Sequence, residues 1–194
     1  MPMIDDAAWQ RARRVLRNGL TSSPHCSIAS VDPDGRPHVT PIGSVMLAPE
    51  PGRGIFFDIL DARLSRNVDA APTSCVLAVD SRKTVWLRAL GSGRFTDPPG
   101  VQLDGTAGPK REATTAEIER FGRRVRPMHN TKGGRLLWDD LGTVRDLTFS
   151  SLSPVHLGAM TRNAETVIAA SDRDDRRRDR VRIERSARRA PSRS

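Results

Sequence analysis

Residues 27–43 read SIASVDPDGRPHVTPIG, and this stretch decides the fold. Two runs of small and β-branched residues flank the tetrapeptide Asp32-Pro33-Asp34-Gly35. Proline presets φ and glycine accepts a positive φ, which are the demands of a short hairpin turn. The pattern therefore predicts two antiparallel strands, at residues 25–31 and 36–42, joined by this turn.

Short apolar runs separated by turn residues predict further strands along the chain. The run at residues 74–80 is apolar on both of its faces, which is typical of a strand in the middle of a covered or closed sheet. A long bent strand is expected at residues 84–95, with Gly91 and Gly93 as bulge or corner positions. The remaining expected strands are residues 45–48, 55–59, 101–108, 145–151 and 154–160.

Apolar residues at helical spacing predict a first helix over residues 6–18, ended by Gly19. A second, short helix begins at Asp61, which is a suitable N-cap, and ends before Pro72. Its expected buried stripe consists of Leu64, Val68 and Ala71.

The sequence Thr114-Thr115-Ala116-Glu117 matches a capping box and predicts a third helix that runs to about Val125. Residues 127–134 are expected to form a loop. Six to eight strands with short turns and three or four helices indicate an α+β fold, an antiparallel β-barrel with helices packed outside it.

The net charge of +9 is unevenly distributed. Residues 172–194 hold ten arginines and five acidic residues with almost no apolar side chains, so this segment carries more than half of the excess charge. Such a composition favours disorder. We therefore expect one folded domain over residues 1–165 and a basic, disordered tail over residues 166–194. The tail is either a solvated extension or a binder of nucleic acid or another polyanion.

The composition also indicates the cellular compartment and shows which cysteine and metal chemistry to expect. No apolar run approaches the length of a membrane span, and the N-terminal residues lack the apolar segment of a secretory signal, so a cytoplasmic protein is expected. Cys26 and Cys75 each lie in an apolar run and are expected to be free thiols. No spacing of cysteine and histidine suggests a metal site.

Three segments in this order resemble the flavin-binding family of pyridoxamine 5'-phosphate oxidase. They are SIASVDPDGRPHVTPIG at residues 27–43, GIFFDI at residues 54–59, and DARLSRNVDAAPTSCVLAV at residues 61–79. VQLDGTAGPKREATTAEIERF at residues 101–121 resembles the family's later strand and helix. The resemblance covers most of the chain up to about Arg162.

This resemblance implies an antiparallel split β-barrel with flanking helices, a homodimer, and FMN bound in a groove between the subunits. The flavin ring would rest against the strand that contains Thr40, and the phosphate would bind at residues 58–67, chiefly to Arg63. A helix start and a guanidinium are both suited to a phosphate. The implied cofactor-binding residues are His38, Thr40, Pro41, Ile42, Phe57, Asp58, Arg63, Leu64 and Asn67.

One position departs from the family pattern, because Leu64 stands where the family often has lysine after the arginine. A deazaflavin coenzyme, F-420, is therefore an alternative cofactor. No C-terminal R-x-H-like motif is present, which disfavours the vitamin B6 reaction itself.

Some candidate residues leave two interpretations open. His38 either reaches the edge of the flavin or is an exposed strand residue, and Asn67 either faces the same groove or is local helix polarity. His129 and Lys132 are candidates for the substrate side, or belong to a loop without function. Trp86 and Trp138 are expected to be core or dimer-contact aromatics.

The resulting hypothesis is a flavin-dependent oxidoreductase that transfers hydride between FMN and a small organic substrate. One alternative is a deazaflavin-dependent reductase on the same fold. Another is a non-catalytic split-barrel protein, flavin-binding or associated with nucleic acid, that acts through its basic tail.

Overall fold

The computed structural model describes residues 4–59, 62–129, 131–138 and 141–162. The described residues divide into two compact units, one within residues 4–83 and 99–155 and one of residues 84–98 with 156–162. The first unit contains the whole sheet and every candidate site residue. The predicted tail, residues 166–194, lies outside the described residues, so its disorder and its partners stay predictions.

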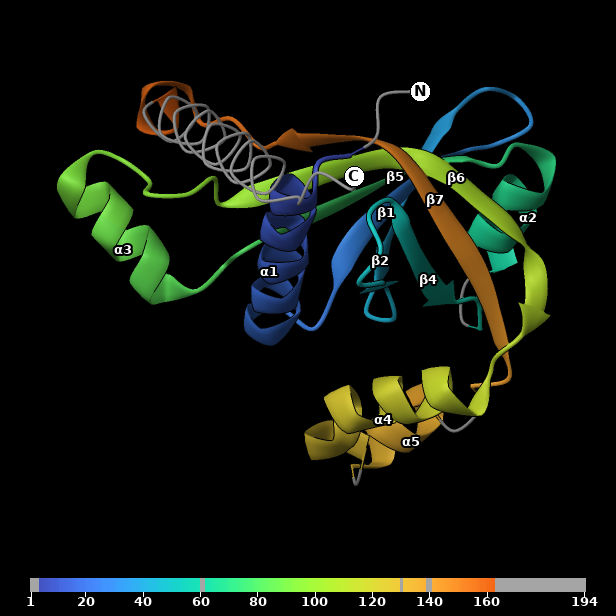
Figure 1. Ribbon diagram of the computed structural model, residues 1–194. Coiled ribbons are helices and arrows are strands. Elements are labelled where there is room, and N and C mark those ends of the chain that lie inside the picture. The colour runs from blue at the N-terminus through green and yellow to red at the C-terminus, as the bar shows by residue number, and fades with distance from the viewer. Residues whose placement is uncertain (1–3, 60–61, 130, 139–140, 163–194) are drawn as a thin grey trace, which may run out of the picture. The chain divides into compact units, whose positions relative to one another are not determined.

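Five α-helices, seven strands and one 3₁₀ helix make up the described chain (Figure 1). None of these helices has both the length and the apolar character needed to cross a bilayer. In chain order the elements are α1 (Asp6–Ser22), β1 (Cys26–Val31), β2 (Pro37–Ile42), β3 (Met46–Leu47), β4 (Arg53–Phe57), α2 (Ala62–Ala70), β5 (Thr73–Val79), α3 (Lys83–Ser92), β6 (Gly100–Glu112), α4 (Thr115–His129), α5 (Lys132–Trp138), β7 (Thr143–Pro154) and η1 (Gly158–Met160).

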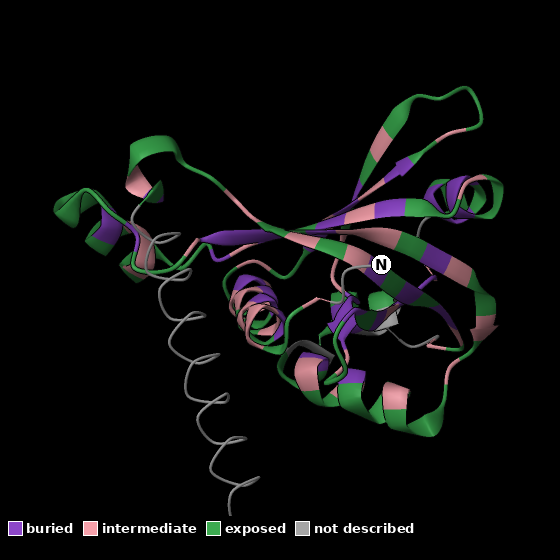
Figure 2. Cartoon of the chain, turned by 45° about the horizontal axis from the view of Figure 1, so that its top comes forward, coloured by how far each residue is buried: buried purple, intermediate pink, exposed green. Residues whose placement is uncertain are grey.

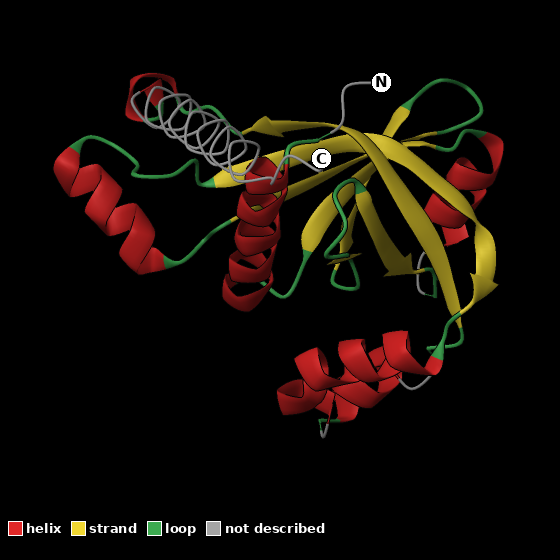
Figure 3. Cartoon of the chain, viewed as in Figure 1, coloured by secondary structure: helices red, strands yellow, loops and turns green. Residues whose placement is uncertain are grey.

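The seven strands form one antiparallel sheet in the order β2-β1-β5-β6-β7-β4-β3. β6 and β7 are the longest strands, and Figure 3 shows both strongly curved. Their register shifts between Asp104 and Gly105 and again between Ala107 and Lys110. Such irregularities increase twist and bend a strand, so they let the sheet curl toward a barrel.

The predicted hairpin at the start of the sheet is confirmed. Cys26 pairs with Ile42 at one end of the β1–β2 ladder, and Val31 pairs with Pro37 at the turn. Within the turn the Asp32 carboxylate accepts hydrogen bonds from the Arg36 and Asp34 N–H groups, at 2.8 and 3.1 Å. Gly35 has a φ of 81°. Turn chemistry alone thus accounts for this hairpin.

Helix α1 covers the core of the first unit. Trp9, Ala12 and Leu16 are buried and pack with strand residues such as Ile28 and Leu103 (Figure 2). The Trp9 indole N–H donates to the Ala48 carbonyl at 3.0 Å, which satisfies its one polar atom. Truncating a side chain of this kind typically costs about 3–5 kcal/mol.

The first helix is longer than predicted. Gly19 was expected to terminate it, but α1 continues to Ser22, and Gly19 is buried inside the helix. A Cβ at this position would lie 2.8 Å from the Val79 carbonyl oxygen. Gly19 therefore allows α1 and β5 to pack closely. In the sequence, a glycine in this role looks the same as one that ends a helix.

The predicted strand at residues 84–95 is wrong, because this segment forms helix α3. Within the second unit, Trp86 contacts Phe95 edge-to-face with ring centroids 5.3 Å apart, and Ala89 is buried. Gly93 has a φ of 68° directly after the helix, where a C-terminal glycine belongs. Gly91 and Gly93, predicted as bulge or corner positions of a strand, instead lie at the C-terminal end of helix α3.

Two further predictions near the C-terminal end are corrected. Residues 127–134 were expected to be a loop, yet α4 extends to His129 and α5 begins at Lys132. The strand expected at residues 154–160 is absent, because β7 is a single strand that ends at Pro154. η1 follows it, with a φ of 57° at Gly158. Proline has no N–H for a ladder, and the glycine conformation redirects the chain.

Candidate functional site

The turn between β4 and α2 is anchored by a buried ion pair. Arg145, on β7, donates from Nε to Asp58 Oδ2 at 2.6 Å, and the two side chains are 1% and 3% exposed. The same guanidinium donates to the Ser65 hydroxyl at 3.1 Å and lies 2.8 Å from Asp69. Lys110 Nζ lies 3.5 Å from the same Asp58 oxygen. One guanidinium therefore joins Asp58, after the end of β4, to Ser65 and Asp69 within α2.

Helix α2 also contacts the first hairpin. Arg63, in its first turn, lies 3.6 Å from the Asp32 carboxylate. The pKa of Asp32 is lowered, chiefly by the hydrogen bond from the Arg36 N–H. One turn further, the Asn67 amide donates to the Ser30 hydroxyl at 3.0 Å, and both are buried. The side chain of Arg63 is 52% exposed, so it has surface left for a ligand.

The strand β2 divides the other predicted residues between two faces. His38 is the register partner of Ser30, and Thr40 is the partner of Ile28. Since Ser30 and Ile28 are buried, His38, Thr40 and also Ile42 point to the inner face of the sheet, the face against which Asn67 packs. Pro41 alternates to the opposite, exposed face. The structure thus groups His38, Thr40 and Ile42 with α2 and separates Pro41 from them.

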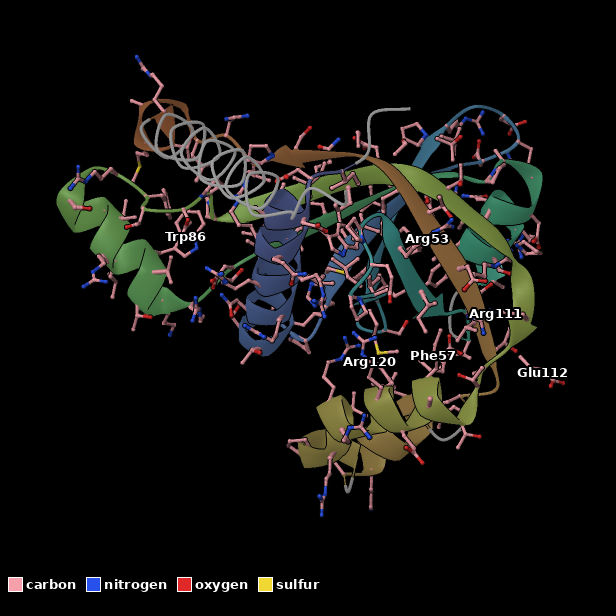
Figure 4. The ribbon with its side chains drawn as sticks, viewed as in Figure 1. Arg53, Phe57, Trp86, Arg111, Glu112 and Arg120 are labelled. Carbon is pink, nitrogen blue, oxygen red and sulfur yellow. The ribbon has the colours of Figure 1, made fainter. Side chains whose placement is uncertain are left out.

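Two of the predicted residues belong to the hydrophobic core. Leu64 is 2% exposed and packs in the core cluster of the sheet. Phe57, labelled in Figure 4, is 2% exposed. Its ring contacts that of Phe121 on α4, with ring centroids 5.0 Å apart. A cofactor at this turn would therefore meet the backbone of these residues, while their side chains support the fold.

The two substrate-side candidates lie at the junction of α4 and α5. Lys132 opens α5 and is exposed, whereas His129 ends α4 and its side chain lies outside the described residues, as does that of Trp138. Among the described residues, no hydrogen bond or ion pair joins Lys132 to Asp58 or to α2. The role of both residues stays a prediction.

Helix α4 holds the segment that follows β2. Arg124 donates to the carbonyls of Gly43 and Val45, the latter at 2.8 Å, and Arg120 donates to the Leu47 carbonyl at 2.8 Å. The Arg124 guanidinium also lies 4.8 Å from the centroid of the Phe121 ring. Burial lowers the pKa of Arg124 to about 10. These arginines fix the backbone that continues the predicted ring-binding strand.

Cys26 and Cys75 are free thiols, and burial raises the pKa of each to about 12. Such thiols are protonated at neutral pH and are poor nucleophiles. In the described part of the chain, no three histidine, cysteine, aspartate or glutamate side chains are grouped to hold a metal ion.

Sequence reasoning missed Arg145 and Lys110. A signal for Arg145 was present, because Arg145, Leu147 and Phe149 alternate on one face of β7 and all three are buried. A lone arginine on an otherwise apolar face indicates a buried partner. For Lys110 there was no such signal, since it is a half-exposed residue after a bulge.

The chain was compared with known proteins at three levels. The family model of pyridoxamine 5'-phosphate oxidase matches residues 12–145, which is more than half of the chain. The chain belongs to the pyridoxamine 5'-phosphate oxidase family. The family assigned from the three sequence segments is thereby confirmed. A search of curated proteins returned no match.

Solved structures resemble the chain in fold. An FMN-binding protein from Syntrophomonas wolfei subsp. wolfei is 13% identical, with a TM-score of 0.54, covering 79% of this chain and 89% of its own. HupZ from Group A Streptococcus is 16% identical, with a TM-score of 0.51, covering 81% and 98%. An F420 reductase is 15% identical, with a TM-score of 0.46, covering 73% and 94%. The first two likenesses concern the fold alone, and together with the family match they confirm the predicted α+β split barrel with flanking helices.

Proposed function

We propose that the chain is a flavin-dependent oxidoreductase that binds FMN at the β4–α2 turn. The observation that carries this proposal is the half-exposed guanidinium of Arg63 in the first turn of α2. The segment that precedes this helix is joined to β7 by the ion pair of Asp58 with Arg145. Early helix N–H groups and a guanidinium suit a phosphate group. Lys110 adds a second half-exposed cation next to Asp58. Membership in the family supports the same assignment.

The residues present fit a flavin phosphate even though Leu64 supplies no cation. Its side chain is in the core, and a lysine there would lose that packing. Lys110 and Arg63 approach the turn from β6 and α2, so two cations border it without position 64. Bound flavin supplies hydride chemistry with a small organic substrate. The protein's part is to hold the phosphate and to present the edge strand β2, which contains Thr40, to the ring.

A homodimer with the cofactor between the subunits is part of this proposal. The outer face of the β2-β1-β5 edge exposes Val39 by 60%, Leu77 by 39% and Val31 by 36%. The register puts these residues on one face, since Val39 pairs with Ala29 and Leu77 with Ser27. A second copy of the chain would cover this apolar surface.

Titration of the purified protein with FMN and with riboflavin tests the phosphate site. The protein is expected to bind FMN tightly and riboflavin more weakly. Arg63→Ala should weaken FMN binding about tenfold or more and leave riboflavin binding unchanged, because a charge-assisted hydrogen bond is lost. Arg36→Ala is the matched control, because Arg36 is an exposed arginine paired with Asp34 in the neighbouring turn. Equal effects of the two variants would contradict the assignment.

The deazaflavin F-420 is the second candidate, and the core position of Leu64 favours it because the usual lysine is missing. Titration with F-420 in place of FMN separates the two. Saturable binding of F-420 without FMN binding would replace the first proposal with the second. Binding of neither would remove the redox function and leave the family fold.

A further inference from the structure

A second charged cluster lies on the part of the sheet that α4 covers. Arg111, on β6, binds two carboxylates at once. Its Nη2 lies 2.6 Å from Glu117 Oε1 and 2.7 Å from Asp146 Oδ1, and its Nε donates to Asp146 at 2.9 Å. The hydrogen bond from Arg111 lowers the pKa of Glu117 to about 2. Both carboxylates are therefore engaged by Arg111.

Beside this cluster is a cavity of about 280 Å³ between the sheet and α4. Its lining combines the apolar residues Met46 and Ile55 with the arginines Arg53 and Arg120, while Leu147, whose side chain is buried in the core, borders it from β7. Glu117 and Asp146 border it as well. Figure 4 labels Arg53 on the sheet and Arg120 on α4, so the two cations come from the two sides of the cavity.

The two arginines retain hydrogen-bonding capacity. Arg53 donates from Nη1 to the Thr148 hydroxyl at 2.8 Å, and Arg120 donates from Nη2 to the Leu47 carbonyl at 2.8 Å. Among the residues that the structure describes, neither guanidinium has a carboxylate within ion-pair distance. A guanidinium has five N–H donors, so each arginine keeps donors for an oxyanion. The two arginines and two acids of the lining balance, and Arg111 beside them brings the cluster to three guanidinium groups against two carboxylates.

We propose that this cavity binds a small organic anion. Its carboxylate or phosphate head would lie against Arg53 and Arg120, and its apolar body against Met46 and Ile55. Bidentate recognition of such a head group is the chemistry for which arginine is suited. The volume admits a ligand of about one ring with its head group, at the small end of the usual range for ligand pockets. Arg53 begins β4 whereas Asp58 follows its end, so this site is separate from the proposed flavin site.

Phenyl phosphate is a suitable probe, with benzoate as the carboxylate counterpart and benzyl alcohol as the neutral one. The full chain, labelled with ¹⁵N, is titrated while the amide signals of Ala48 and Gly54 at the cavity are followed. Phenyl phosphate should shift both signals saturably, inorganic phosphate should bind more weakly, and benzyl alcohol should have no effect. Comparison with benzoate tells whether the site prefers the phosphate or the carboxylate head.

Arg53→Gln and Arg120→Gln should each raise the dissociation constant about tenfold, as expected for loss of a charge-assisted contact. Arg17→Gln, which removes an exposed arginine on α1, is the matched control and should leave it unchanged. The proposal would be overturned if the Arg53 and Arg120 variants bound phenyl phosphate as tightly as the parent does. Absence of saturable shifts in the parent, or equally tight binding of benzyl alcohol, would overturn it as well. FMN affinity of the same variants should be unaltered, so failure of this site and failure of the flavin site are distinguishable.

Discussion

Asp58 and Arg145 form a buried ion pair between residues 87 positions apart in the chain, with Arg145 Nε 2.6 Å from Asp58 Oδ2. The pair joins β7 to the turn that carries the candidate phosphate site. The Gly108 carbonyl, at 3.1 Å, and the Ser65 hydroxyl accept further hydrogen bonds from the same guanidinium. A guanidinium excluded from water requires such partners. Arg145 therefore contributes both to the stability of the sheet and to the position of the candidate phosphate site.

Removing the charge of either residue of this ion pair should destabilise the folded state. Arg145→Met leaves the Asp58 carboxylate buried with only Lys110 nearby, and Asp58→Asn leaves the guanidinium without its shortest ion pair. Each variant is expected to lower the free energy of unfolding by about 3–5 kcal/mol. Urea unfolding followed by circular dichroism measures this.

The double variant is the informative comparison for the pair. Because removal of both charges leaves neither one uncompensated, its destabilisation should be smaller than the sum of the two single effects. Additive losses would show that the two side chains do not interact.

Gly105 is required at the bulge of β6. A Cβ there would overlap the Thr148 carbonyl oxygen and lie 2.7 Å from the Phe149 Cα. Both neighbours are backbone atoms of β7 that cannot move without disturbing the ladder. Gly105→Ala is expected to destabilise the fold by about 2 kcal/mol or more.

Gly122, inside α4, is the matched control because a Cβ there meets no atom within 4 Å. Gly122→Ala should raise the unfolding free energy by about 0.5–1 kcal/mol, the usual difference in helix propensity. Thermal unfolding of both variants tests the contrast, and similar effects of the two would contradict it.

Glu117 should make stability depend on acid pH. Its carboxylate accepts from Arg111 and from the Thr114 N–H, at 2.8 Å, in the predicted capping box, which is thereby confirmed. These bonds lower its pKa from 4.5 to about 2. A carboxylate with a lowered pKa stabilises the folded state fully above its unfolded value, and this contribution is lost as the pH falls from about 4.5 toward 2.

Glu117→Gln should therefore lower the unfolding free energy by about 1–2 kcal/mol at pH 7, and the difference from the parent should shrink near pH 2. Glu119→Gln serves as the control, since Glu119 is 65% exposed and makes only a long surface ion pair with Arg123. Its effect should stay within about 0.5 kcal/mol at both pH values. A Glu117 variant whose deficit is the same at all pH values would contradict this explanation.

The exposed apolar face of the β2-β1-β5 edge should control assembly. Val39→Lys combined with Leu77→Lys places two charges on the surface that the proposal assigns to a second copy. Sedimentation velocity is expected to show a dimer for the parent and a monomer for this variant, together with weaker FMN binding.

Leu87→Lys is a suitable control for this experiment, because Leu87 is an apolar residue of the second unit that is 69% exposed, more than Val39 or Leu77. A parent protein that sediments as a monomer would contradict the dimer. A variant that remains a dimer would instead place the interface elsewhere.

Features with local causes could be predicted from sequence. The hairpin at residues 27–43 depends on a turn whose proline, glycine and aspartate act within a few residues of one another. The capping box depends on Thr114 and Glu117, three residues apart. The family resemblance also directed attention to Arg63, which the structure places half-exposed at the start of α2. The predicted binding roles of these residues await the titrations.

Features that depend on long-range partners could not be predicted. Residues 84–95 carry apolar side chains that suit either a strand or a helix, and only the contact of Trp86 with Phe95 and the end at Gly93 favour the helix. Gly19 is a plausible helix terminator until the approach of Val79 shows why it is small.

By itself, the sequence determined the β1–β2 hairpin, the capped start of α4 and the family to which the chain belongs. Tertiary structure alone decided which charge partners Asp58, which arginines border the cavity near α4, and which predicted residues share the inner face with α2. The physical reason is that turns and caps are satisfied by neighbours in the chain. A buried charge must instead be satisfied by whatever the register of distant strands brings beside it.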